Sequence, residues 1–171
     1  MDNAWRTLQI VTDWIKHAEA KAAVTLTAAG VIGGILYSLV TTTSPRNLPF
    51  DLAASLGAAL TAGSAMAAGL VLRPRRKTNG NNGNNEQPPN LLFFEHIARA
   101  YRSPEDGYTQ ALSRLLADDR KLTTAVAEQI WANAHVARQK YFWSSIGTVL
   151  LLYAFASVLL TATLGVLGDA T

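Results

Sequence analysis

The residues that could carry chemistry in this chain are few, and their spacing matches no hydrolytic or metal-binding pattern. The three histidines, at positions 17, 96 and 135, form no His-Glu-x-x-His pair, and Glu95 and His96 are neighbours that point to different sides of a helix. The sequence contains no Gly-x-Ser-x-Gly, phosphate-loop or Gly-x-Gly-x-x-Gly motif. Adjacent Asp118 and Asp119 fit the start of a helix better than a metal site. We therefore expect a protein that is not an enzyme and that needs no metal or other cofactor.

Nucleotide binding is a second kind of chemistry, and it needs a cation for the phosphate together with an aromatic or apolar face for the base. The region from residue 91 to residue 141 supplies both kinds of side chain. The candidate ligand-binding residues are Arg99, Arg102, Arg138, Lys140 and Tyr141. A simpler interpretation makes Arg138 and Lys140 the basic collar of a membrane helix and the aromatic side chains packing residues. From the residues alone both interpretations stay open.

Asp13, His17 and Lys21 form a third group with functional potential. Their i, i+4 spacing places an acid, an imidazole and an ammonium in one column of a helix, just before an apolar run that begins at Ala22. The column is explained either by pairs that stabilise the helix, with an interfacial lysine at its end, or by a functional role at the membrane entrance.

The elements that must position these residues are dominated by three charge-free runs, of 24 residues (22–45), 21 residues (52–72) and 28 residues (141–168). About 20 apolar residues suffice for a helix to cross the hydrocarbon core of a bilayer. The alternative, a soluble bundle of Ala-rich helices, would have to bury all three runs in a short chain. The sequence therefore predicts an all-α membrane protein, with three transmembrane helices at 22–40, 52–72 and 141–167 and a small cytoplasmic helical cluster.

The basic residues indicate the orientation in the membrane. Three of the 15 Lys and Arg residues precede the first run, one lies between the first and second, eleven lie between the second and third, and none follows the third. By the positive-inside rule the N-terminus and residues 73–140 face the cytoplasm, and the C-terminus faces out. The segment before the first run lacks the basic leader of a signal peptide, so we expect the first span to be retained. The chain has no cysteine, which excludes disulfides.

The segments outside the apolar runs have distinct compositions. Residues 1–21 form an amphipathic helix, residues 73–90 are a basic, Asn- and Gly-rich linker, and residues 91–140 are helical. In the first of these the apolar positions are Ala4, Leu8, Val11, Ile15, Ala18 and, at its end, Ala22. Ser103 and Pro104 predict the start of a helix that runs to Ala117.

The longest predicted element is one helix from Asp119 to Leu167, capped by Asp118, which begins in water and ends in the bilayer. In its first half the apolar positions are Leu122, Val126, Ile130, Ala134, Ala137 and Tyr141. These positions indicate a helix that packs on a partner, so the helix would connect the cytoplasmic cluster to the membrane.

Small residues predict close contacts between the apolar helices. Gly30 and Gly34 form a small-xxx-small pair in the first span, and in the second span pairs such as Ala59 and Gly63 keep one side small. A helix so poor in bulky side chains gains more from helix contacts than from lipid. We expect association within the chain, between chains, or both, and a homo-oligomer as the assembly.

Three stretches carry a resemblance to a known family. They are a Trp-x8-Trp stretch that ends in residues 19–22 (Glu-Ala-Lys-Ala), residues 92–97 (Leu-Phe-Phe-Glu-His-Ile), and residues 108–141, which end in Arg-Gln-Lys-Tyr. In their order and spacing these stretches resemble the small membrane effectors of the pyrimidine cyclase antiphage system (Pycsar), of the PycTM type.

This resemblance implies a bacterial inner-membrane protein encoded beside a uridylate or cytidylate cyclase. Cyclic UMP or cyclic CMP would activate it to impair the membrane and stop growth before the phage matures, which is abortive infection. The other effector type of that system carries a cyclic-nucleotide β-barrel, and this chain has no strand pattern for one, so the ligand site stays unassigned. No nucleic-acid partner is expected. The alternative function is a constitutive membrane anchor or scaffold for a cytoplasmic partner.

Overall fold

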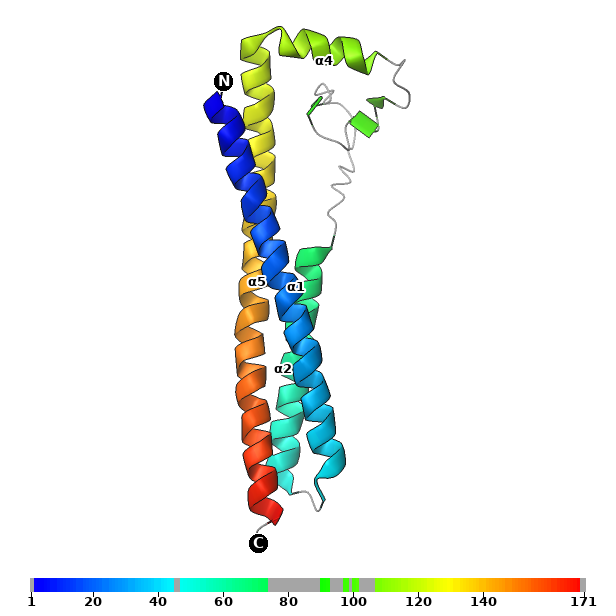
Figure 1. The fold of residues 1–171 in the computed structure, drawn as a ribbon, viewed down its shortest axis with the longest axis vertical. Helices are drawn as coiled ribbons and strands as arrows, with labels where there is room; N and C mark the ends of the chain where they lie inside the picture. Colours follow the sequence, from blue (N-terminus) through cyan, green and yellow to red (C-terminus); the bar gives the residue numbers. More distant parts are fainter. Residues whose placement is uncertain are drawn as a thin grey trace, which may run out of the picture. The chain divides into compact units, whose positions relative to one another are not determined.

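The computed structural model describes residues 2–44, 47–73, 90–92, 97–98, 100–101 and 107–169, and only these are discussed below. Four helices are present: α1 (Asp2–Thr42), α2 (Leu48–Leu72), α4 (Tyr108–Leu116) and α5 (Asp119–Asp169) (Figure 1). The described part of the chain contains no strand. Helices α1, α2 and α5 are long and apolar enough to cross a membrane. The predicted all-α membrane class is therefore confirmed.

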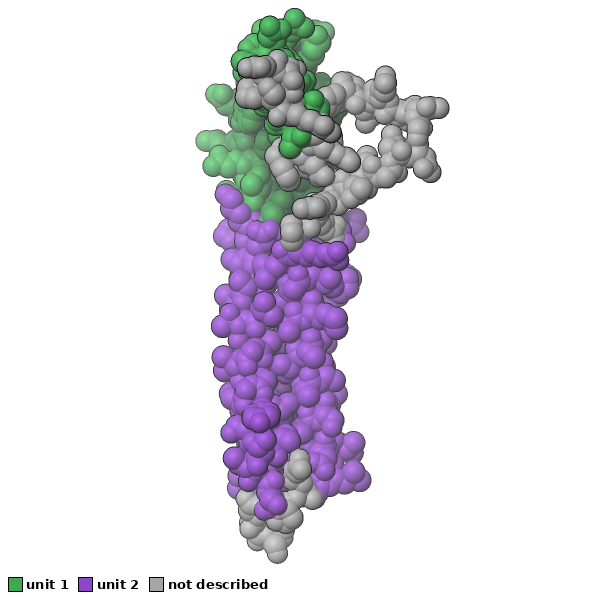
Figure 2. Space-filling view, turned by 90° about the vertical axis from the view of Figure 1, so that its right-hand side faces the viewer, with its two compact units in different colours: residues 1–15, 75–137 green, residues 16–74, 138–171 purple. Residues whose placement is uncertain are grey.

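The chain divides into two compact units (Figure 2). Unit 1 consists of residues 1–15 and 75–137, and unit 2 of residues 16–74 and 138–171. Helices α1 and α5 each contribute residues to both units, and α5 is one unbroken helix of 51 residues. The expected continuity of the long helix between a polar half and an apolar half is therefore present.

Unit 2 is a bundle in which parts of α1, α2 and α5 lie side by side (Figure 1). Its main apolar core draws two residues from each helix: Ile32, Leu36, Phe50, Ala54, Ala154 and Val158. A second cluster joins Ala22, Ala68 and Val71, with Trp143 packed against it. The apolar runs of the sequence thus form the contacts among the three long helices.

Helices α2 and α5 approach closely because small residues and hydroxyl groups lie between them. The Ser64 hydroxyl donates a 2.8 Å hydrogen bond to the carbonyl oxygen of Gly147, and the Ser157 hydroxyl donates one of 2.8 Å to the carbonyl of Ala53. A Cβ atom at Gly147 would lie in van der Waals contact with α2, 3.5 Å from the Ser64 carbonyl oxygen, so the two helices are closely packed at this point. The expected association of small residues within the chain is found here.

The three glycines expected to mediate helix packing differ in their surroundings. A Cβ atom on Gly63 would lie 3.4 Å from a methyl carbon of Leu150 in α5, whereas one on Gly30 or Gly34 would meet nothing within 4 Å. Gly63 therefore serves a contact inside the chain. Gly30 and Gly34 lie on a face of α1 that none of the described residues covers.

The ends of α2 and the start of α5 are set by local chemistry. The Asn47 side chain accepts a 3.0 Å hydrogen bond from the Phe50 N–H at the start of α2. One carboxylate oxygen of Asp118 accepts the N–H groups of Arg120 and Lys121, each at 3.1 Å. Asp118 is therefore the cap of α5 that the sequence predicts. The pKa of Asp118 lies below its usual value, and the largest cause is the hydrogen bond from the backbone N–H of Lys121.

Helix α4 begins later than the sequence predicts. The start signal at Ser103 and Pro104 lies outside the described residues, and the described helix begins at Tyr108 after Gly107. The φ angle of Gly107 is 84°, a left-handed conformation that a continuous helix cannot contain. No side chain of α4 is buried.

Two hydrogen bonds connect segments of unit 1. The Tyr108 hydroxyl donates a 3.3 Å hydrogen bond to the Leu91 carbonyl oxygen, and the Asn90 amide donates one of 3.4 Å to the carbonyl oxygen of Ala125.

The packed face of α5 differs in part from the predicted stripe. Leu122, Val126 and Ala137 are buried as expected, but Ala134 and Tyr141 are exposed. The buried positions that follow Ala137 are Lys140, Ser144 and Gly147. The prediction relied largely on four-residue steps, each of which turns about 40° beyond one full rotation, whereas the packed face alternates steps of four and three.

Candidate functional site

Lys140 is a charged residue with a buried side chain. It lies in the apolar interior of unit 2, and only 7% of its surface is exposed. Its ammonium donates a 2.7 Å hydrogen bond to the Glu19 carboxylate and another of 2.7 Å to the carbonyl oxygen of Val71. Glu19 belongs to α1, Val71 to α2 and Lys140 to α5. We call this three-helix contact the Lys140 node.

The sequence around the node explains why the contact forms. Val71 lies in the last turn of α2, where backbone carbonyl groups lack partners within the helix and attract a positive charge. Ala22 of α1 packs with Ala68 and Val71 of α2, and Trp143 of α5 packs against this cluster. These contacts hold the three helices together where the Glu19 carboxylate meets the ammonium.

The energetic value of the node depends on the burial of its two charges. An exposed ion pair contributes about 0 to 1 kcal/mol, whereas removing one partner of a fully buried pair costs about 3 to 5 kcal/mol. The side chain of Lys140 is 9% exposed and that of Glu19 is 43% exposed. Loss of Glu19 would leave an ammonium in an apolar interior, while loss of Lys140 would leave a carboxylate that water can reach. The two deletions are therefore not equivalent, and loss of Glu19 is the more costly.

A second cation contacts α5 close to the node. The Lys21 ammonium lies 5.9 Å from the centre of the Tyr141 ring, which is within the range of a cation–π contact. Of the predicted membrane-entrance column, Lys21 thus contacts another helix, while His17 is exposed and Asp13 is half-buried. A functional role for the column stays a prediction.

The predicted ligand-binding residues are only partly described. Arg99 and Arg102 lie outside the described residues, and Arg138 is exposed on α5. The ammonium of Lys140 is bonded within the chain, and the ring of Tyr141 is near Lys21.

Sequence reasoning missed Glu19. Its available signal was the position between buried Ala18 and the apolar stripe that continues at Ala22. The acid is 121 residues away from its lysine in sequence, so spacing alone could not pair them.

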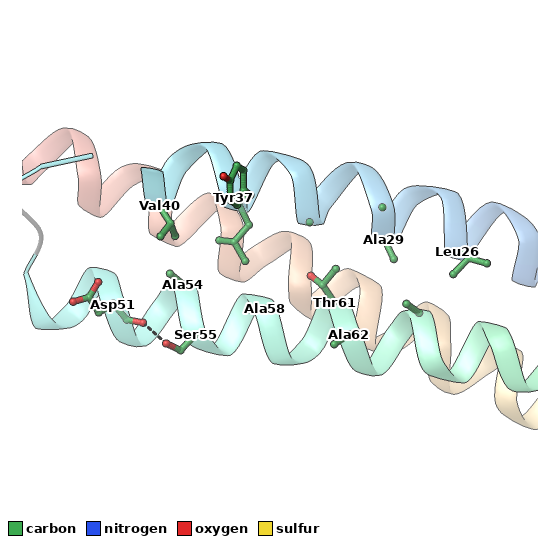
Figure 3. Close-up of a pocket in the computed structure, with 14 residues that line it drawn as sticks. Leu26, Ala29, Tyr37, Val40, Asp51, Ala54, Ser55, Ala58, Thr61 and Ala62 are labelled. Carbon is green, nitrogen blue, oxygen red and sulfur yellow. Dashed lines mark hydrogen bonds between the residues drawn. The ribbon is translucent and has the colours of Figure 1, made fainter. Parts of the chain in front are cut away.

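A groove of about 710 Å³ runs between α1 and α2 on the outer side of unit 2 (Figure 3). Ala29, Gly30 and Gly33 of α1 face Ala58, Thr61 and Ala62 of α2 along it. Asp51, Ser55 and Tyr37 lie towards one end (Figure 3). Within the described part of the chain, no group of three His, Asp or Glu side chains could hold a metal ion.

The architecture defines a helical membrane protein with three helices of spanning length. The family description "Pycsar effector protein domain" (PycTM) matches residues 3–167, and the chain belongs to this family. The Pycsar effector protein PtPycTM of Propioniciclava tarda is 33% identical over 144 residues, which cover 84% of this chain and 69% of the relative. No solved structure matches the chain. Family membership confirms the resemblance found in the sequence and supports an antiphage effector role.

Proposed function

We propose that this protein is a membrane effector of a bacterial antiphage system, which a cyclic pyrimidine nucleotide activates to impair inner-membrane integrity and cause abortive infection. The family match over residues 3–167 is the observation that carries this proposal. The activating ligand is cyclic UMP or cyclic CMP, made by a partner uridylate or cytidylate cyclase. Three helices of spanning length give such an effector direct access to the bilayer.

The proposed orientation follows from the basic residues. Eleven of the 15 lie between the second and third apolar runs, which supports a cytoplasmic location for the N-terminus and residues 73–140. A cyclic nucleotide made in the cytoplasm reaches only that side. A reporter enzyme fused after the last residue, active only outside the cytoplasm, tests the orientation, and activity only in the cytoplasm contradicts it.

The proposed nucleotide contacts use the cytoplasmic arginines and not Lys140. Arg138 is exposed, whereas Lys140 already donates to Glu19 and Val71. To shift an equilibrium from 1:99 to 99:1, a ligand must favour one state by about 5.5 kcal/mol. One charge-assisted hydrogen bond contributes about 1.5 to 3 kcal/mol. Several contacts, or several subunits of a homo-oligomer, must therefore act together.

The decisive experiment reconstitutes the purified chain in vesicles that contain a self-quenched dye. Dye release on addition of cyclic UMP or cyclic CMP, but not of cyclic AMP or cyclic GMP, is the expected result. Equal dye release with all four nucleotides would show that activation is not specific for pyrimidine nucleotides. Absence of release with any of them, from vesicles in which correct insertion is shown, would contradict the proposed function.

Single substitutions examine the ligand contacts. Arg99→Ala and Arg138→Ala are each expected to raise the nucleotide concentration for half-maximal dye release by about tenfold or more, because each removes one charge-assisted contact. Arg120→Ala is the matched control, because it removes an exposed arginine near the start of the same helix as Arg138. An unchanged concentration dependence in both variants would exclude these arginines as ligand contacts.

A further inference from the structure

We propose that the Lys140 node is a lock that keeps a hydroxyl-lined interface between α2 and α5 closed, and that loss of the Glu19 contact admits water to this interface. The inference rests on the proposed function, because it identifies the part of the bundle that changes when the effector acts. It concerns residues of unit 2 alone.

The buried interior of unit 2 contains hydroxyl side chains as well as its apolar core. The buried polar and charged residues of the described chain are Thr25, Thr61, Ser64, Lys140, Ser144, Ser157 and Thr161. Six of these seven carry only a hydroxyl, and Lys140 is the single charge among them. Polar side chains at such depth are costly in lipid and are associated with helix contacts and ion pathways.

Three of these hydroxyls, on Ser144, Ser157 and Thr161, follow the lysine along α5, and Ser64 of α2 lies against Gly147 of α5. Ser144 is one helical turn from Lys140, and Gly147 is about one turn further. At Gly147 the carbonyl oxygen accepts the Ser64 hydroxyl of α2, and the Ser157 hydroxyl donates to the Ala53 carbonyl of α2. The closed helices thus pair the Ser64 and Ser157 hydroxyls with carbonyl groups of the opposite helix, and separated helices would present these groups to water.

The node has the features of a contact that can be released. The Glu19 side chain is 43% exposed, so the described chain leaves one side of the ion pair uncovered. The ammonium can donate three hydrogen bonds, of which Glu19 and Val71 each accept one. Without Glu19 the buried ammonium has lost its counter-charge. Hydration of that charge then favours separation of α5 from α2, which begins at the node and continues along the hydroxyls.

A purely structural role is the competing explanation, and it makes a different prediction. If the node only holds the helices together, its loss lowers the amount or stability of the protein in the membrane without opening a water path. The chain contains no cysteine, so a single introduced thiol reports water access to the interface without background.

The test places Ser64→Cys in the full chain, in vesicles without nucleotide, and measures reaction with a membrane-impermeant thiol reagent. Ser64 has no exposed surface, so the thiol is expected to be unreactive when Glu19 is present. Adding Glu19→Gln should accelerate the reaction by about tenfold or more, because the charge-assisted contact is lost. Met66→Cys is the control, since Met66 is 68% exposed on the outer face of α2 and should react equally slowly with either residue at position 19.

Glu19→Asp provides a milder second variant, because it keeps the charge and shortens the side chain by one methylene group. It should give an intermediate reaction rate at Ser64→Cys, and it decides the matter if Glu19→Gln does not accumulate in the membrane. If the thiol in Glu19→Gln reacts no faster than in the chain with Glu19, the lock is wrong. If Glu19→Gln does not accumulate, the same result in Glu19→Asp overturns the lock.

The nucleotide response separates the two proposals. If the Glu19 variants open the interface but no cyclic nucleotide opens it in the chain with Glu19, the lock stands and the nucleotide-activated function fails. If a cyclic pyrimidine nucleotide causes dye release while the thiol at position 64 stays unreactive, the function stands and the lock is wrong.

Discussion

The cap of α5 is a contact that a single substitution can remove. The Asp118 carboxylate accepts two backbone N–H groups, those of Arg120 and Lys121. Asp118→Ala is therefore expected to fray the first turn of α5, whereas Asp118→Asn keeps an acceptor and should leave the turn intact. Faster amide hydrogen exchange at Arg120 and Lys121 in the alanine variant alone is the measurement. Equal exchange in both variants would contradict the capping role.

The pKa of Asp118 gives this cap a defined pH dependence. Because the folded chain holds that pKa below the usual 3.8, the cap contributes its full stabilisation above pH 3.8. The stabilisation is lost as the pH falls through the lower, folded value. Exchange at Arg120 and Lys121 should rise in that acid range for the unmodified chain, beyond the intrinsic effect of pH, and should show no such rise for Asp118→Asn.

The hydroxyl of Ser157 should stabilise the bundle measurably. Its hydrogen bond to the Ala53 carbonyl joins α5 to α2 in the buried interior. Hydrogen bonds between membrane helices contribute about 0.6 kcal/mol on average and about 1.7 kcal/mol at most, so Ser157→Ala should destabilise the bundle within that range. Unfolding in mixed micelles is the measurement. Ser55→Ala is the matched control, because the Ser55 hydroxyl bonds only within α2 at an exposed position.

At the scale of single residues, the sequence predicted contacts whose partners are close to each other in the chain. The Asp118 cap could be predicted because the carboxylate and the N–H groups are within three residues of each other. Lys140 was recognised as a candidate for charge chemistry, but its partner Glu19 was not. That pairing depends on how two helices lie against each other, which the charge pattern of either helix alone does not specify.

At the scale of helices, the open glycines of α1 offer a specific test of assembly. In Gly34→Leu the new Cβ meets no atom of the described residues within 4 Å, so the change should leave the fold of one chain intact. If another copy packs on this face, the same change should lower the amount of oligomer and of dye release. Cross-linking in membranes measures the first quantity. Val31→Leu, at an exposed position of the same helix, is the control.

Comparing Gly63→Leu with Gly34→Leu separates packing within one chain from packing between chains. Gly63→Leu would press on Leu150 in α5 and should lower the stability of a single chain as well as its activity. If Gly34→Leu leaves both the oligomer and the dye release unchanged, the open face of α1 is not an assembly surface.

The helices themselves were largely predictable, and their contact faces were less so. Uninterrupted apolar runs located α1, α2 and α5, because a span of lipid requires such a run and little else. The face of α5 near the membrane was misassigned, since Tyr141 was expected inside and Lys140 is found there. A one-residue error rotates the assigned face by 100°, and a charged residue at the interior position runs against the usual preference for apolar side chains.

At the scale of the whole molecule, the continuity of α5 suggests how a signal could pass between its polar and apolar halves. We expect that inserting Gly-Gly between Lys140 and Tyr141 uncouples the two, because glycine weakens a helix and the insertion also rotates everything beyond it. Nucleotide should still bind the detergent-solubilised variant, while dye release is lost. Ala-Ala at the same place is the control for rotation without flexibility. Binding and dye release that both persist at the original level would show that α5 does not transmit the signal.

The Lys140 node also fixes the level at which three helices meet. Glu19, Val71 and Lys140 lie at one level, and from there α1 to Thr42, α2 back to Leu48 and α5 to Gly165 each extend for about 35 Å. At the far end Gly165 again lies beside Phe50 and Thr43. The hydrocarbon core is about 30 Å thick, so we expect the charges of the node to rest at the headgroup boundary in a bilayer of ordinary thickness. A bilayer with longer acyl chains would draw Glu19 and Lys140 into hydrocarbon, and hydrophobic mismatch would then favour the paired, closed arrangement.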